Sequence, residues 1–245
     1  MDRSYLSDQQ VVEASRGFVC ARLITFEDSE EAKLMKRLFG GRRLVNTMFT
    51  IMDPSGKNAL VRAGRSTRMA FDDAAAMAVE MRAVLTRFPG RKNVAAADLG
   101  LPVLEDVCIA LNVTECDAQQ LVILRGNVQQ VEELRKQLTE LSWSPKLVGR
   151  FLYSVADDKT DWQALKGAAK AAKAGVLIVR SEPYGLTGEV VADAKAAVTV
   201  KELEKMLVAA VASHKPKAVD TRRLRRRGIR NGVQWQTELS APKGR

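Results

Sequence analysis

Covalent chemistry in this chain would have to use three cysteines and one histidine, its only thiols and its only imidazole. They are Cys20, Cys108, Cys116 and His214. No two cysteines form a CxxC pair, and one histidine with three scattered cysteines matches no ligand spacing for a metal. A nucleophilic Cys–His pair would need His214 to reach Cys116, and nothing in the sequence brings the two together. We therefore assign no catalytic residue, no metal site and no cofactor.

Two thiols, Cys116 and Cys20, remain candidates for an oxidoreductase that uses a single cysteine. Cys116 stands between Glu115 and Asp117, whose negative charges disfavour a thiolate. Cys20 lies inside the apolar run 18–25, where a free cysteine is expected to be a buried and inert small hydrophobe. Neither position has the positive surroundings that activate a thiol.

A dense arginine run near the C-terminus is the most unusual segment of the chain. Ten Lys and Arg between residues 214 and 245 stand against two acidic residues, so this segment carries +8 of the net charge of +10. Such a run can neutralise the phosphates of a nucleic acid or an acidic protein surface, and its plain alternative is a solubilising or packed arm. No helical periodicity is visible after Pro216. The candidate polyanion-binding residues are Arg222, Arg223, Arg225, Arg226, Arg227 and Arg230.

Composition bounds the class of protein. With 245 residues and 46% hydrophobic residues, the chain can form one large core or two ordinary ones. The sequence contains no run of eighteen apolar residues, so we expect no membrane-spanning helix. The polar start MDRSYLSDQQ does not have the apolar region of a secretory signal. Sparse, unpaired cysteines fit a reducing compartment, so we expect a cytoplasmic protein.

The first half of the chain predicts helices, one buried strand and a hairpin. In the hairpin turn 53–57, Pro54 presets φ and Gly56 accepts a positive φ. The predicted elements are helices over 9–16, 30–39 and 71–88, a strand over 18–25, and hairpin strands over 47–52 and 59–63.

The second half, after a linker over 91–102, repeats this order. We expect Cys108 to lie in the core on a strand and His214 to bind the last carbonyls of its own helix. The predicted elements are strands over 107–113, 121–125 and 147–155, helices over 128–141, 157–173 and 200–214, and a hairpin of 176–180 with 189–194.

Both halves thus read helix, strand, helix, hairpin, helix, with hairpin turns about 130 residues apart. Strand–helix–strand followed by an antiparallel hairpin and a packing helix is the order of the thioredoxin fold. The segments FVCARLITFED (18–28) and NTMFTIMDPSGKNALVRAGRS (46–66) also resemble bacterial thioredoxin-family proteins.

The resemblance covers most of residues 1–213 and is strongest over 18–66. It implies an α/β fold of two tandem thioredoxin-like units, the first lacking its N-terminal β-α-β, plus a basic C-terminal extension. The corresponding domains are 1–92, 101–214 and 215–245.

The departures from the family concern its chemistry. Thioredoxins act through a CxxC pair after the central strand, where this chain reads Arg125-Gly126-Asn127-Val128. The family also places a cis-proline just before the first hairpin strand, where this chain has Val45-Asn46 and Ala174-Gly175. The resemblance therefore implies the scaffold and no catalytic residue.

Three functions follow as hypotheses. The first is a redox-inactive thioredoxin-like binding or structural protein, more a binding module than an enzyme, with a protein partner or a second copy and no membrane. The second is the single-cysteine oxidoreductase, and the third is a nucleic-acid-associated protein acting through the arginine run.

A further expectation concerns the strand predicted over 18–25. Without the opening strands of a thioredoxin sheet, it would be an edge with unpaired backbone groups. We expect that edge to be covered by the second unit, by the alternating stretch 232–239, or by another subunit.

Overall fold

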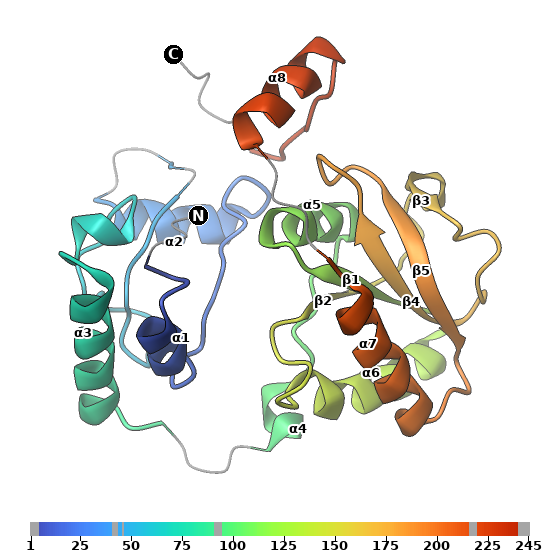
Figure 1. The fold of residues 1–245 in the computed structure, drawn as a ribbon, viewed down its shortest axis with the longest axis horizontal. Helices are drawn as coiled ribbons and strands as arrows, with labels where there is room; N and C mark the ends of the chain where they lie inside the picture. Colours follow the sequence, from blue (N-terminus) through green and yellow to red (C-terminus); the bar gives the residue numbers. More distant parts are fainter. Residues whose placement is uncertain (1–4, 41–43, 46, 91–94, 216–219, 240–245) are drawn as a thin grey trace. The chain divides into compact units, whose positions relative to one another are not determined.

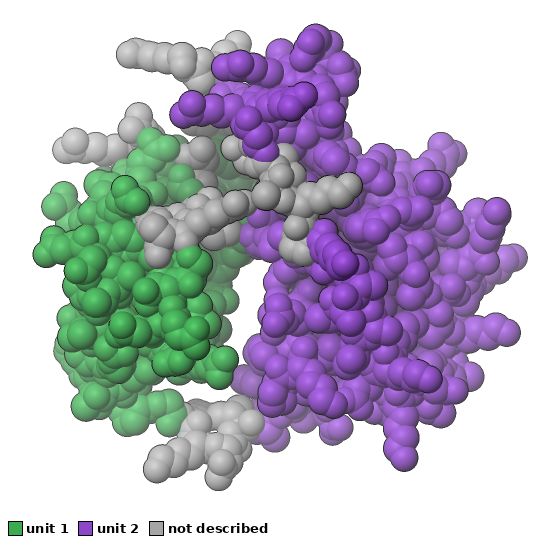
Figure 2. Space-filling model, in the orientation of Figure 1, with its two compact units in different colours: residues 1–92, 236–245 green, residues 93–235 purple. Residues whose placement is uncertain are grey.

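The computed structural model describes residues 5–40, 44–45, 47–90, 95–215 and 220–239, and its fold is mixed α/β, as predicted. The chain divides into two compact units, which Figure 2 shows in separate colours. Unit 1 comprises residues 1–92 with 236–245, and unit 2 comprises residues 93–235. Each unit has its own buried apolar core.

Unit 2 is built on a five-stranded mixed sheet with the strand order β2-β1-β4-β5-β3. β1 pairs in parallel with β2 and antiparallel with β4, β4 pairs antiparallel with β5, and β3 pairs in parallel with β5. The strands are β1 (Gln120–Arg125), β2 (Phe151–Val155), β3 (Leu165–Lys166), β4 (Gly175–Ser181) and β5 (Gly188–Lys195).

Helices cover both faces of this sheet, which is why its central strands read as unbroken apolar runs (Figure 1). Alternate side chains of β1 and β4 enter a core with α6 and α7 on one face and a core with α5 on the other. The helices of unit 2 are α4 (Ala96–Leu99), α5 (Val107–Asp117), α6 (Val128–Ser142), the 3₁₀ turn η2 (Trp162–Ala164), α7 (Val200–Ser213) and α8 (Thr221–Arg230).

Two capping boxes fix where the main sheet helices begin. Asn127 and Gln130 bond reciprocally at the start of α6, and Thr199 and Glu202 do the same at the start of α7. Each box satisfies two backbone N–H groups that a helix start leaves without intrahelical partners. The predicted helices over 128–141 and 200–214 are confirmed, as are β1 and the β4–β5 hairpin.

Unit 1 has a helical core. α1 packs against α3, and the buried Val11, Ala14, Met77 and Met81 lie between them. All three predicted helices of this half are confirmed. The helices are α1 (Gln9–Ser15), α2 (Ser29–Leu38), the 3₁₀ turn η1 (Thr67–Met69) and α3 (Ala74–Arg87).

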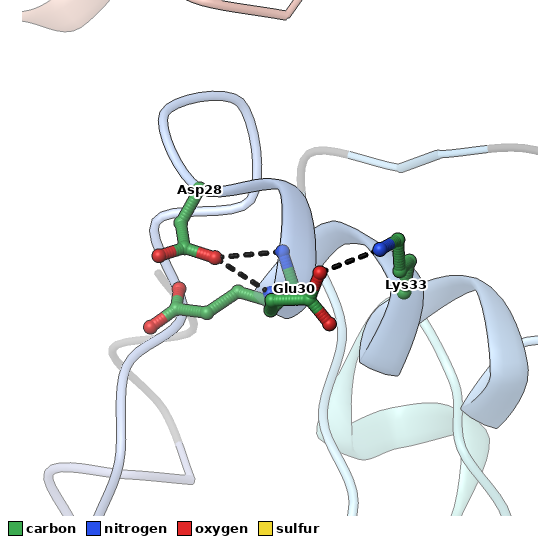
Figure 3. Close-up of polar contacts among 4 residues, drawn as sticks. Asp28, Glu30 and Lys33 are labelled. Atoms are coloured by element: carbon green, nitrogen blue, oxygen red, sulfur yellow. Dashed lines mark hydrogen bonds and ion pairs between the residues drawn. The ribbon is translucent and has the colours of Figure 1, made fainter.

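Aspartates cap the three helices of unit 1, and Figure 3 shows the cap of α2. Asp28 accepts from the N–H groups of Glu30 and Glu31 at 2.8 and 2.9 Å. One turn on, Lys33 pairs with Glu30 at 2.5 Å on the exposed face. The acidic first turn also suits the positive end of the helix dipole.

The predicted hairpin of unit 1 forms, but its two arms pair at fewer positions than expected. Its two arms meet in isolated antiparallel bridges, Phe49 with Gly64 and Met52 with Ala59. The turn is held by Asp53, whose carboxylate accepts from the Ser55 hydroxyl at 2.6 Å and the Asn58 side-chain amide at 2.7 Å. In the described part of unit 1 no continuous strand forms.

The strand predicted over 18–25 is therefore wrong. The segment is irregular, and Val19 is 93% exposed. Apolar and β-branched residues favour a strand only where a neighbouring strand offers its backbone, and among the described residues no strand pairs with this segment. The expected sheet edge does not exist, and 232–239 forms no strand over it. Within unit 1, the Leu239 N–H does donate to the Phe26 carbonyl at 2.8 Å.

Two further predictions are wrong in unit 2. The run 107–113 lies in helix α5, because the Asp106 carboxylate accepts from the N–H groups of Cys108 and Ile109 and so starts a helix. The segment 157–173 is mostly turns with η2 and β3, not a helix. β2 also begins only at Phe151, after a turn that includes Leu147.

Candidate functional site

The first candidate site is the β1–α6 junction, defined here as residues 125–128 together with 174–175. β1 is an interior strand of the sheet, between β2 and β4, and ends at Arg125, which is opposite Gly175 in the β4 register. Gly126 follows with φ 149°, and Asn127 then caps α6. The junction thus brings the end of a buried strand, a helix start and the first residue of β4 together.

Arg125 fills this junction. Its residue is only 9% exposed, although five N–H donors must be satisfied. Nη2 donates to the Ala171 carbonyl at 2.8 Å, Nε donates to the Ala172 carbonyl, and both Nη atoms reach the Ala168 carbonyl at 3.4 Å. The guanidinium therefore organises the turn that replaces the predicted helix.

An aromatic ring and a carboxylate complete the surroundings of Arg125. The guanidinium carbon lies 5.0 Å from the centre of the Trp162 ring, within cation–π range. Burial lowers the pKa of Arg125, and the charge of Asp193 opposes that shift. Asp193 also accepts from the Ala172 N–H at 2.9 Å, which ties β5 to the same turn.

Gly175 closes the other side of the junction. Its φ is 145°, and a Cβ there would lie 1.8 Å from the carbonyl oxygen of Ala194. The Ala174 carbonyl accepts from the Ala196 N–H at 3.0 Å. Backbone therefore packs directly on backbone where a side chain would otherwise stand.

The structure changes the surroundings expected for the cysteines. Cys20 is exposed in the irregular segment after α1, not buried in a strand, and its thiol approaches the Ser15 carbonyl at 3.9 Å. Desolvation by nearby chain raises the pKa of Cys20, so its thiol is a weaker source of thiolate. Cys108 is also exposed, on α5, and the prediction of a core position is wrong.

Cys116 lies in the last turn of α5 and is exposed. Burial, and secondarily the charge of Glu182, raise the pKa of the neighbouring Glu115. His214 is nearer in the fold than its sequence position suggests: its Nε2 donates to the carbonyl of Ala118, which ends α5, at 3.0 Å. Its ring thus binds the end of α5, while its backbone N–H donates to the Ala210 and Val211 carbonyls, so His214 also binds the last carbonyls of its own helix, as predicted. Among the hydrogen bonds of the described residues, none joins Cys116 to His214.

The second candidate site is α8, which carries the arginine run. The expectation that periodicity ends after Pro216 is wrong, because Asp220 accepts from the N–H groups of Arg222 and Arg223 and starts a helix. All six arginines of α8 are exposed. Within the described residues, none of them forms an ion pair with a carboxylate.

Sequence reasoning missed Arg125 as the centre of a contact network. The available signal was its position, a cation directly after four fully buried apolar residues of β1. A charge at that point must find partners inside the fold. The identity of those partners, three carbonyls from a turn more than forty residues away, could not be read from spacing.

The described residues contain no group of three or more His, Cys, Asp or Glu that could hold a metal ion. No helix in the described ranges combines the length and apolarity needed to cross a bilayer. Comparison with protein-family models, curated proteins and solved structures gives no match for the chain.

Proposed function

We propose that this chain is a non-catalytic binding protein whose unit 2 is a thioredoxin-like scaffold. The observation that carries the proposal is Arg125. At the place where the resemblance would put a reactive thiol pair, the chain has a buried guanidinium bonded to three backbone carbonyls. A guanidinium stays protonated at physiological pH and offers neither a nucleophile nor a redox couple.

The order of elements in unit 2 supports the scaffold. β1, α6 and β2 form a strand–helix–strand unit, β4 and β5 form the antiparallel hairpin, and α7 packs against the same sheet face as α6. This is the order that the family resemblance implies. Gly175 stands where the family has its cis-proline, and its close approach to Ala194 favours a packed wall over a substrate groove.

The proposal is limited to unit 2. Unit 1 has a bridged hairpin between α2 and α3, but its described residues contain no strand to begin a second such scaffold. A protein partner or a second copy of the chain, and a cytoplasmic location, belong to the proposal because of the sparse unpaired cysteines and the missing thiol pair.

A disulfide-reduction assay tests the absence of thiol chemistry. The full chain should reduce insulin disulfides no faster than free cysteine at equal thiol concentration, with or without a thioredoxin reductase. Cys116→Ser and Cys20→Ser should each leave the rate of insulin reduction per thiol unchanged. Turnover coupled to the reductase and lost in Cys116→Ser would establish the single-cysteine oxidoreductase instead.

A specific observation favours one second candidate function, association with nucleic acid. The arginines of α8 are exposed and lack carboxylate partners in the described residues, so their charge is available to phosphates. Arginine forms two parallel hydrogen bonds to a phosphate, which lysine cannot do. Replacing exposed arginines of α8 by glutamine should weaken binding to a polyanion in a salt-dependent way.

A further inference from the structure

We propose that Tyr184 docks α8 on unit 2 so that five arginines form one surface for the phosphate backbones of duplex DNA. The inference rests on the second candidate function above and adds to it a fixed orientation and a partner. We call Arg222, Arg223, Arg226, Arg227 and Arg230 the arginine face, and the contacts of Tyr184 with α8 the dock.

The dock holds one side of α8. The Tyr184 hydroxyl donates to the Leu224 carbonyl at 3.3 Å and accepts from Arg227 Nε at 3.3 Å. The Tyr184 ring packs on Gly228, where a Cβ would lie 2.9 Å from the ring carbon Cε1. Gly228 is also the one buried residue among positions 222–230 of α8, for which burial is described. Glycine destabilises a helix relative to alanine, and the close ring gives this glycine a packing reason.

The loop that carries Tyr184 is itself held firmly. Tyr184 has φ 88°, a conformation that a non-glycine residue adopts only where its surroundings impose it. Its carbonyl accepts from the Asn112 side-chain amide at 3.3 Å. The next residue, Gly185, approaches so closely that a Cβ there would lie 2.5 Å from the Asn112 Cα. α5 thus anchors the β4–β5 loop, and the loop positions Tyr184.

Helix geometry places Arg222, Arg226 and Arg230 away from the dock, while Arg227 lies at its border and bonds Tyr184 through Nε. At about 100° per residue, Arg222, Arg226 and Arg230 follow one another in steps of about 40°. Arg223 and Arg227 complete an arc of about 140°, with Leu224 and Gly228 on the opposite side. The eight steps from Arg222 to Arg230 span about 12 Å along the axis. The face is therefore one compact cationic surface, not a scatter of charges.

The chemistry of this face fits phosphate better than a protein partner. Arginine is enriched in protein interfaces, but the core of such an interface is apolar and depleted of charge, and the arginine face offers no apolar core. Ile229, 68% exposed, is the single large apolar side chain left open on α8. A single strand would be held by aromatic stacking, and α8 carries no aromatic residue.

Duplex geometry favours DNA over RNA. An α-helix with its side chains is about 10–12 Å across, which matches the roughly 12 Å major groove of B-form DNA. The major groove of A-form RNA is too deep and narrow for side chains to read. The expected binding is to the backbone, without sequence preference, because the face carries only cations.

Fluorescence anisotropy of the full chain with a labelled mixed-sequence DNA duplex, titrated with salt, tests the arginine face. Arg222→Gln with Arg226→Gln should lower the slope of log K against log[salt] by about 2, since each phosphate contact contributes about 0.9. The matched control is Lys201→Gln with Lys205→Gln, which removes the same charge from two exposed positions on α7. The control should change the slope by less than half as much.

Gly228→Ala tests the dock apart from the helix. Alanine favours helix but collides with the Tyr184 ring, so DNA affinity should fall about fivefold through lost preorganisation while α8 keeps all its charges. Tyr184→Phe keeps the ring and loses both hydrogen bonds, and its DNA affinity should fall less than that of Gly228→Ala. Ile229→Ala, which leaves the dock intact, should bind as the natural chain does. Trypsin should cut α8 faster in Gly228→Ala than in Ile229→Ala.

Each outcome decides a different claim. If the natural chain does not bind the duplex at low salt, the second candidate function is wrong and the inference with it. If only the arginine pair weakens binding and Gly228→Ala does not, the function stands and the dock is wrong. If the arginine pair behaves like the lysine control, the arginine face is wrong. Equal affinity for single-stranded DNA or duplex RNA contradicts the assignment of the partner.

Discussion

Arginine has opposite roles in two regions of unit 2, the β1–α6 junction and α8. Arg125 is 9% exposed, and its guanidinium donates to the carbonyls of three residues. The arginines of α8 are exposed, and within the described residues they lack carboxylate partners. The same type of side chain fills the β1–α6 junction in one region and is exposed to solvent, where it can bind a ligand, in the other. Its surroundings, not its type, decide whether it stabilises the fold or can bind a ligand.

This difference predicts that substitutions in the two regions will affect different measurements. Changes at the junction should alter the free energy of unfolding, because they leave buried groups without partners or bring backbone into collision. Changes on the arginine face should leave stability within about 0.5 kcal/mol, as is usual for surface positions.

The largest effect is expected for Gly175→Ala. The new Cβ would have to displace the Ala194 carbonyl oxygen, 1.8 Å away, at a φ of 145°. We expect unit 2 to lose about 4 kcal/mol or more of unfolding free energy, measured by urea denaturation. The control is Gly56→Ala, with φ 65° and open space around it, which should cost only about 1–2 kcal/mol of backbone strain. Equal losses at both positions would show that the close approach at Gly175 is unimportant.

The second-largest loss of unfolding free energy is expected for Arg125→Met. Methionine keeps an apolar stem but leaves the carbonyls of Ala168, Ala171 and Ala172 without their donor. Unsatisfied buried groups cost about 1–3 kcal/mol each, so we expect a loss on the order of 3 kcal/mol. All three tryptophans of the chain lie within residues 93–235, so their fluorescence reports the unfolding of unit 2.

The matched control for this substitution is Arg180→Met on β4. Arg180 is exposed and pairs with Glu189 at 2.6 Å, and such surface pairs contribute at most about 1 kcal/mol. If Arg180→Met loses as much unfolding free energy as Arg125→Met, the distinction between buried and exposed arginines is contradicted.

The smallest effect is expected at Asp53 in unit 1, an exposed group that does have partners. Hydrogen bonds from Ser55 and then from Asn58 lower the pKa of Asp53 to about 2. A lowered folded-state pKa means that this contribution is present above the ordinary pKa, about 3.9, and is lost as pH falls towards 2. The difference in urea midpoint between the natural chain and Asp53→Asn should therefore shrink between pH 5 and pH 2. A pH-independent difference would argue against this carboxylate network.

The parts of the fold that could be predicted are those with local signals. β1 and β4 are apolar runs because both sheet faces are covered, and the capping boxes at Asn127 and Thr199 mark the helices that follow. α5 and α8 were missed although each begins with an aspartate cap, Asp106 and Asp220. The apolar run of α5 is typical of a strand and the basic run of α8 of an irregular arm, but the capping aspartate starts a helix in both.

The remaining errors involve partners that are distant in the sequence. The segment 18–25 has strand composition, but no strand in the described part of unit 1 pairs with it. The turn 167–173 has helix composition, but its carbonyls bond Arg125 instead of forming a helix. For the candidate sites, the sequence was enough to find the exposed arginines. The dock on Tyr184 and the network around Arg125 depend on contacts across forty residues or more, which spacing does not reveal.

The most direct test measures unfolding free energy and DNA affinity in parallel for Arg125→Met and for Arg222→Gln with Arg226→Gln. The structure predicts two separate effects: the first variant loses about 3 kcal/mol of stability and, under conditions where it remains folded, keeps its DNA affinity. The second keeps its stability and loses affinity and salt dependence. A folded Arg125 variant that no longer binds DNA, or an α8 variant that loses as much stability as the Arg125 variant, would contradict the division of roles between the two arginine environments.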